Sequence, residues 1–109
     1  MPRARMQVLQ GTLDVLVLKA LSGGARHGYA VARWIRGATD ELLIEDRALY
    51  VALHRMEQRG WIASEWGVSE NNRRAKYYAL TAAGRKQLRA QSARWERYAA
   101  AVTKVLQKA

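Results

Sequence analysis

Apolar residues near the start of the chain recur at helical spacing between Gly11-Thr12 and Ser22-Gly23-Gly24. The pattern predicts a first helix with Thr12 as its N-cap. Val15 and Leu18 add a second apolar face, and a helix that is apolar nearly all round is buried on both sides. In so small a protein, we therefore expect a second chain to cover one face. The main apolar face holds Leu9, Leu13, Leu16, Val17, Ala20 and Leu21.

Two more helices follow at residues 27–36 and 47–59, with Gly37 and Gly60 as stop signals. Between them, Leu42-Leu43-Ile44 has the composition of a short strand, and Asp46 stands at the expected N-cap position of the third helix. The second helix is expected to bury Tyr29, Val31, Ala32 and Ile35. The third is amphipathic: Leu49, Ala52, Leu53 and Met56 form a core face, opposite Arg47, Tyr50, His54, Arg55 and Gln58.

The pattern then changes from helical to extended. Residues 61–66 and 76–80 are rich in aromatic and β-branched residues, which favours two strands. The polar residues 67–75 separate them, so the segment is expected to form a β-hairpin with a long, basic tip. The first ten residues, with Pro2, Arg3 and Arg5, are expected to form a loose basic arm.

A last helix is predicted from the N-cap Thr81 to the end of the sequence, because no helix breaker follows Arg85. Leu88, Trp95 and Val102 recur every seven residues, which is close to coiled-coil spacing. A helix of this length extends beyond a small domain, so its apolar stripe needs a partner. We therefore divide the chain into a first domain (1–80) and a dimerisation helix (81–109).

Composition excludes several classes of function. The sequence has 109 residues, which suits one domain, and it has no cysteine and two histidines, so thiolate sites and a histidine zinc site are not expected. No catalytic constellation or cofactor motif is visible, and we expect no enzyme, metal or cofactor. Asp14 and Lys19 bracket the apolar run Val15–Leu18, so no membrane span is expected and a cytoplasmic protein is the default.

The net charge of +10 points to a polyanionic partner, because a basic surface attracts phosphates. Three helices followed by a hairpin have the order of a winged helix-turn-helix, a mostly α fold with a small β-hairpin. In that fold one face of the third helix packs on the core and the other enters a major groove of double-stranded DNA. The basic hairpin tip is then long enough to reach phosphates beside it.

Several motifs, in order and closely spaced, resemble the PadR family of bacterial transcription regulators. The resemblance covers about residues 9–100 and implies a homodimeric winged-helix repressor of the short form, with one C-terminal dimerisation helix. The sequence departs from the usual pattern at Ala25, Arg47-Ala48 and Val51, where the family has proline or Gly-Ser. The motifs are Leu9-Gln10-Gly11-Thr12-Leu13-Asp14, His27-Gly28-Tyr29, residues 49–57, Gly60-Trp61-Ile62, residues 69–78 and Leu80-Thr81-x-x-Gly84-Arg85.

The candidate DNA contacts come from the third helix, the hairpin and the start of the second helix. Arg55 suits a guanine edge if it reaches a base, whereas Lys76 has the alternative of packing its stem over Trp66. For Tyr50, packing on the hairpin is the alternative, and His27 is expected to be a structural cap. The full set is Tyr29, Arg47, Tyr50, His54, Arg55, Asn72, Arg73, Arg74 and Lys76.

The expected dimer interface comprises Leu9, Leu13, Leu16, Leu88, Trp95, Tyr98, Val102 and Leu106. The family resemblance implies that a flat hydrophobic effector can lie between such helices, at Trp95 and Tyr98, and release the DNA. Core packing in the dimer is the alternative role of Trp95. Two other functions stay open: a basic RNA-binding protein, and a winged-helix dimer used only for protein contacts.

Overall fold

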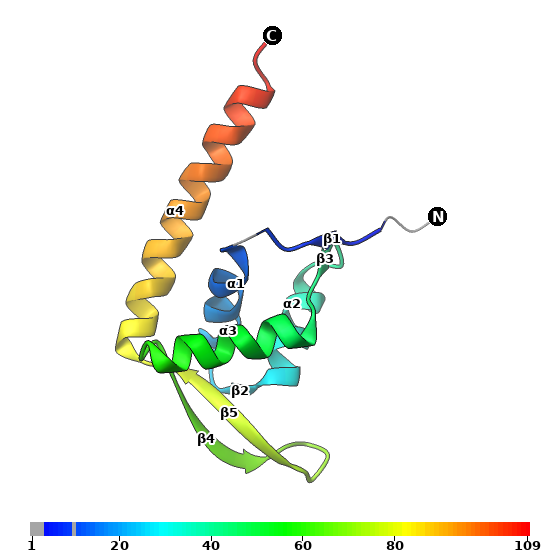
Figure 1. Cartoon of the computed structure of the whole chain (residues 1–109), viewed down its shortest axis with the longest axis vertical. Coiled ribbons are helices and arrows are strands. Elements are labelled where there is room, and N and C mark those ends of the chain that lie inside the picture. Colours follow the sequence, from blue (N-terminus) through cyan, green and yellow to red (C-terminus); the bar gives the residue numbers. More distant parts are fainter. Residues whose placement is uncertain (1–3, 10) are drawn as a thin grey trace.

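The computed structural model describes residues 4–9 and 11–109. It contains four helices and a small antiparallel sheet, arranged as a winged helix with a long C-terminal helix (Figure 1), which confirms the predicted fold class. The helices are α1 (Thr12–Leu21), α2 (Gly28–Ala38), α3 (Asp46–Gln58) and α4 (Ala82–Leu106). The strands are β1 (Met6–Gln7), β2 (Arg26–His27), β3 (Leu42–Leu43), β4 (Ile62–Val68) and β5 (Arg74–Leu80).

The core forms around α1, which packs against α2, α3, α4 and β5. Val17 and Leu18 are fully buried, and Val15, on the second apolar face, is only 9% exposed. The same chain therefore covers most of both faces, and the burial of α1 does not by itself require a second chain. Leu13 and Leu16 are half-buried at the edge of this core.

The N-terminal segment is more ordered than a loose arm, so that expectation is wrong for Met6 and Gln7. They pair in parallel with Leu42 and Leu43, and the Met6 N–H donates to the Glu41 carbonyl at 2.7 Å. The predicted strand at Leu42 is thereby confirmed. Pro2 and Arg3 lie outside the described residues.

The hairpin strands are longer than predicted, and β2 adds a third strand that the sequence did not indicate. β4 and β5 pair from Ile62↔Leu80 to Val68↔Arg74, which leaves residues 69–73 as the loop. The Ser69 N–H donates to the Arg73 carbonyl at 2.8 Å, and Asn72 has a φ of 58°, a left-handed conformation that asparagine tolerates in turns. Gly67 and the polar residues beside it concealed this pairing in the sequence.

Helix boundaries differ from the predictions by one or two residues, except at α4. Gly11, with a φ of 86°, is the N-cap of α1 in place of Thr12. Glu45 is the N-cap of α3 in place of Asp46, and α2 continues through Gly37 to Ala38. At the start of α4 the prediction is confirmed, because the Thr81 hydroxyl accepts the Gly84 N–H at 3.0 Å, but the helix ends at Leu106 and not at the last residue.

The start of α4 is fixed tightly against the start of β4. The Thr81 N–H donates to the Trp61 carbonyl at 3.0 Å, and the Thr81 hydroxyl also lies 2.6 Å from the Gly60 carbonyl oxygen. Gly84 is buried here, and a Cβ on it would lie 1.9 Å from the Trp61 carbonyl oxygen. Only glycine therefore permits this approach.

The C-terminal part of α4 projects away from the rest of the molecule (Figure 1). The radius of gyration is 15.4 Å, whereas a compact chain of this length has about 13 Å. In the part of the chain that the structure describes, no helix has the length and hydropathy needed to cross a membrane.

Replacing Gly84 with alanine is expected to destabilise the fold by about 1–3 kcal/mol or more, because the added methyl group overlaps backbone that has no free space to move. The matched control is Gly37→Ala in α2, where nothing lies within 4 Å of the added Cβ. That control should be neutral or stabilising by up to about 1 kcal/mol. Chemical denaturation followed by circular dichroism measures both, and equal stabilities of the two variants would contradict the contact.

Candidate nucleic-acid interface

The exposed face of α3 is a shallow surface of mixed polar and apolar side chains. It forms because Leu49, Leu53 and Met56 turn into the core and leave the opposite side of the helix free. Val51, which replaces the proline of the family pattern, is 55% exposed on this face. The surface is lined by Arg47, Tyr50, Val51, His54, Arg55 and Gln58, so the structure brings together the polar face that the sequence predicted.

Tyr50 packs on the start of α2 and not on the hairpin alone. A Cβ on Gly28 would lie 2.7 Å from the Tyr50 ring, so glycine at this position makes room for the phenol. Half of the tyrosine surface is still exposed. This contact packs the His27-Gly28-Tyr29 motif against the beginning of α3. Sequence reasoning missed the contact because the two segments are far apart in the chain.

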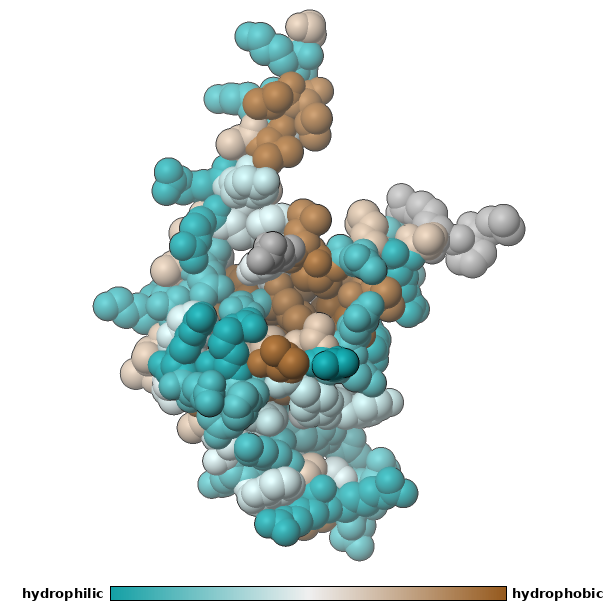
Figure 2. Space-filling model, in the orientation of Figure 1, coloured by the Kyte–Doolittle hydropathy of each residue, from teal (hydrophilic) through white to brown (hydrophobic). Residues whose placement is uncertain are grey.

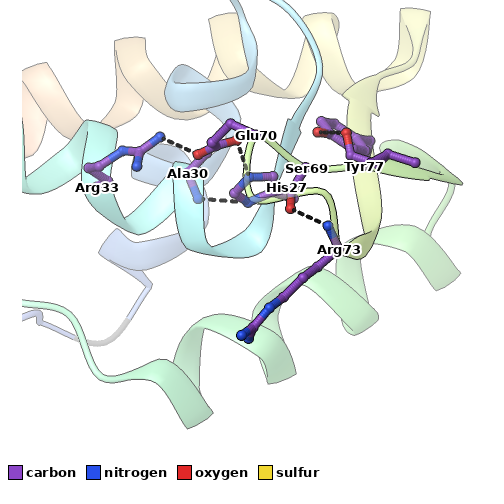
Figure 3. A network of polar contacts seen from close by, with 8 residues as sticks. His27, Ala30, Arg33, Ser69, Glu70, Arg73 and Tyr77 are labelled. Carbon is purple, nitrogen blue, oxygen red and sulfur yellow. Dashed lines mark hydrogen bonds and ion pairs between the residues drawn. The ribbon is translucent and has the colours of Figure 1, made fainter.

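His27 caps α2, as predicted, because its Nδ1 atom accepts the Ala30 N–H at 3.1 Å. The ring proton is then on Nε2, which faces Glu70 Oε2 at 3.4 Å, and Arg33 Nη2 donates to Glu70 Oε1 at 3.2 Å. Figure 3 shows the hairpin loop lying over the start of α2 through these contacts, which we call the wing clasp (His27, Arg33 and Glu70). No sequence motif indicated this network.

The pKa of the Glu70 carboxyl is lowered from 4.5 to about 2. The largest cause is the backbone N–H of Glu70 itself, followed by the hydrogen bonds from His27 and Arg33. Each stabilises the carboxylate over the neutral acid. Glu70 is therefore charged at every physiological pH, and the loop remains attached to α2.

The basic residues of the hairpin differ in their contacts. The Arg73 side chain points away from the wing clasp (Figure 3). Arg74 lies with its guanidinium 4.4 Å from the centre of the Trp66 ring, the position suggested as an alternative for Lys76. Lys76 instead forms an ion pair with Glu57 at 3.4 Å. A hydrogen bond from Ser64, and next the charge of Lys76, lower the pKa of the Glu57 carboxyl.

Two of the residues predicted to contact DNA, Tyr29 and Arg55, lie in other surroundings than expected. Tyr29 is 62% exposed, so its expected burial is wrong; it lies on the outer side of α2, with the Arg33 guanidinium 5.4 Å from its ring centre. Arg55 forms an ion pair with Asp14 of α1, which directs its guanidinium toward α1. His54 is exposed on α3, and Asn72 is exposed at the loop.

A hollow of about 440 Å³ separates the hairpin from the starts of α2 and α3. We call it the wing hollow. Aromatic side chains from α2, α3, β4 and β5 surround it, together with the cations of β5. Its lining includes Tyr29, Tyr50, Trp66, Tyr78, Arg74 and Lys76. Burial raises the pKa of the Tyr78 phenol, so this group stays neutral at physiological pH.

A second concave surface lies between the N-terminal segment, α1 and α4. This apolar groove has a volume of about 730 Å³ and includes Met6, Leu9, Val15, Leu16 and Trp95. Figure 2 shows hydrophobic side chains gathered there and again near the far end of α4. Within the single chain the stripe on α4 stays open, with Trp95 40%, Tyr98 60% and Val102 39% exposed. The described residues contain no group of three or more potential metal ligands.

The fold and the α3–hairpin surface define a winged-helix transcription regulator, a class that binds DNA. The model of the Transcriptional regulator PadR-like family matches residues 17–90, more than half of the chain, so the protein belongs to that family. The protein is therefore a DNA-binding transcriptional regulator.

Solved structures support this assignment. A transcriptional regulator from Clostridium thermocellum is 34% identical, with a TM-score of 0.78, over 88% of this chain and 91% of that one. A PadR family transcriptional regulator from Eggerthella lenta is 34% identical, with a TM-score of 0.76, over 92% of this chain and 86% of that one. Uncharacterized protein X from Lysinibacillus sphaericus is 27% identical over 77% of this chain and 78% of its own length.

Acid titration is expected to leave the wing clasp intact well below the usual range of a glutamate. Because the folded-state pKa of Glu70 is lowered to about 2 from 4.5, its stabilising contribution is present above pH 4.5 and is lost as the pH falls toward 2. Carboxyl ¹³C NMR should follow this directly, with Arg33→Ala raising the pKa. Arg59→Ala, which removes the same charge elsewhere, is the control. A wild-type midpoint near 4.5 would contradict the clasp.

Proposed function

We propose that the protein is a homodimeric repressor that binds a palindromic operator through α3 and the hairpin. A small planar hydrophobic compound, held beside α4, releases the DNA. The observation that carries the proposal is the separation of two surfaces on one small chain. A polar and basic surface covers α3 and the hairpin, while an uncovered apolar stripe follows α4.

The stripe on α4 supports dimerisation. Leu88 packs on the core of its own chain, whereas Trp95, Tyr98, Val102 and Leu106 are exposed. Exposed apolar residues repeating along one side of a helix match the seam of a helix pair. The groove with Leu9 and Leu16 continues this surface, so we assign residues 81–109 and the edge of α1 to the interface.

The surface of α3 and the hairpin supports specific binding to duplex DNA. Arg47, Tyr50 and His54 are positioned along the exposed side of α3, where a recognition helix meets base edges and phosphates. Asn72 and Arg73 lie in the hairpin loop, and Arg74 begins β5 beside it. Lys76 and Arg55 are lesser candidates, because carboxylates of the same chain neutralise them. A repressor acting on the chromosome of a bacterium works in the cytoplasm, where we place it.

The expected effector site consists of Trp95 and Tyr98, whose ring centres lie 6.2 Å apart. A smaller pocket of about 300 Å³ beside them is also lined by Gln91 and Arg94. Flat apolar surface next to a cation favours a planar, weakly acidic aromatic compound over a sugar. Such a ligand releases DNA only by binding more tightly to the released state than to the DNA-bound state.

Replacing Trp95 with glutamate is expected to convert the dimer to a monomer or to an unfolded chain, because the charge enters the seam. The control Ala93→Glu adds the same charge to the opposite side of α4 and should leave the dimer intact. Light scattering at micromolar concentration, with circular dichroism, distinguishes these states. A folded wild-type monomer under these conditions would disprove the dimer.

Affinity for a palindrome whose half-sites lie about 10 base pairs apart should exceed that for one half-site. The affinity should fall steeply with salt. Arg73→Gln with Arg74→Gln removes four cations from the two DNA-binding surfaces of the dimer, so the slope of log affinity against log salt should flatten by about 3–4. Lys104→Gln with Lys108→Gln removes the same charge from the end of α4 and should change the slope much less. Fluorescence anisotropy measures both, and equal slopes would place the contacts elsewhere.

Planar aromatic acids are expected to quench tryptophan fluorescence and to release labelled DNA over the same concentration range. The Trp95→Ala variant should lose both responses, because it removes the ring on which the compound stacks. If that variant still binds DNA and releases it with unchanged ligand affinity, the effector site is elsewhere.

A further inference from the structure

The shortest cation–aromatic contact among the described residues lies in the hairpin, on the side of the wing hollow. The Arg74 guanidinium carbon is 4.4 Å from the centre of the Trp66 ring, compared with 5.3 to 5.9 Å for the other cation–aromatic pairs. Trp66 is 58% exposed, so folding of the core does not explain its large apolar surface. A tryptophan in this position needs a separate explanation.

Strand register explains why these two side chains meet. Trp66 pairs with Lys76, and Val68 pairs with Arg74, so Trp66 and Arg74 are diagonal neighbours on one face of the hairpin. Diagonal side chains in an antiparallel pair are within reach when one is aromatic and the other is long. Both residues line the wing hollow, with Tyr50 of α3 on its other side.

The contact of Arg74 with Trp66 leaves the N–H groups of Arg74 free, whereas nearby cations are paired with carboxylates. Lys76, Arg33 and Arg55 each form an ion pair with a carboxylate of the same chain. Among the described residues, Arg74 forms no ion pair. Among the described residues, the Arg74 guanidinium makes no hydrogen bond to an oxygen acceptor, so its five N–H donors stay available for an anion.

We propose that Trp66 is a positioning residue that holds the Arg74 guanidinium at the wing hollow, oriented to bind a backbone phosphate of duplex DNA. The inference rests on the proposed function. It adds Trp66, a residue that is not among the predicted DNA contacts. An arginine side chain that extends into solvent loses rotamer freedom when it binds a phosphate, and this loss weakens binding. The stack restricts the side chain before DNA arrives, and the bidentate geometry of guanidinium and phosphate then gives a directed contact.

A double-mutant cycle tests this coupling, with binding to the palindrome measured at fixed salt. Trp66→Leu should weaken binding by about 2–5-fold per subunit, the range of an exposed cation–aromatic pair, while Trp66→Phe should stay within about twofold of wild type because it keeps a ring. In the Arg74→Gln background, Trp66→Leu should change affinity less than about twofold, because no guanidinium remains to be held. Equal effects of Trp66→Leu in both backgrounds, or no effect in either, would overturn the proposal.

Three controls keep this result interpretable. Arg74→Lys retains the charge without the planar fork, so it should weaken binding nearly as much as Arg74→Gln; full retention of affinity would overturn the proposal. Arg59→Gln removes the cation of a comparable stack on Trp61 near α4 and should leave operator affinity within about threefold. Circular dichroism shows whether the Trp66 variants keep the hairpin. If the wild-type protein does not prefer the palindrome, the proposed function fails, and this outcome is distinct from an uncoupled cycle.

Discussion

The structure depends on the burial of α1, a short helix with little polar surface. Val17, Leu18, Ala20 and Leu21 are all buried, so the chain must cover α1 from several sides at once. α2, α3, α4 and β5 all pack on it. The remaining gap beside α4 is the apolar groove that includes Leu16 and Trp95. The position of the proposed interface is therefore a direct result of how a small chain covers its central helix.

Carboxylates of the same chain determine which cations of the DNA-facing side remain free. Asp14 neutralises Arg55, Glu57 neutralises Lys76, and Glu70 holds Arg33. Each pair fixes one element against another: α3 to α1, the hairpin to α3, and the hairpin loop to α2. Arg47, Arg73 and Arg74 have no such partner among the described residues, so the unpaired cations of this surface lie at one end of α3 and beside the hairpin tip. The acidic residues thus both stabilise the fold and define its electrostatic surface.

The sequence predicted the order of the elements well because the apolar periodicity of each one is strong. Thr81, with Gly84 three residues later, located the start of α4 correctly, since a capping hydroxyl is a local signal. The site was less predictable. Tyr29 has the spacing of a core residue but is exposed, because Val31, Ala32 and Ile35 already fill the buried side of α2. The ion pairs of Arg55 and Lys76, the wing clasp and the stack on Trp66 join residues brought together only by tertiary packing and strand register.

One residue, Thr81, separates the end of β5 from the start of α4. Its hydrogen bonds to the Gly60 and Trp61 carbonyls, together with the close approach at Gly84, restrict the conformation of this junction. We therefore expect the hairpin and α4 to move together as one rigid body. In a dimer joined through α4, the crossing angle of the two helices sets the distance between the two hairpins. In such a dimer, a change of a few degrees at the seam would produce a larger displacement of the two hairpin tips.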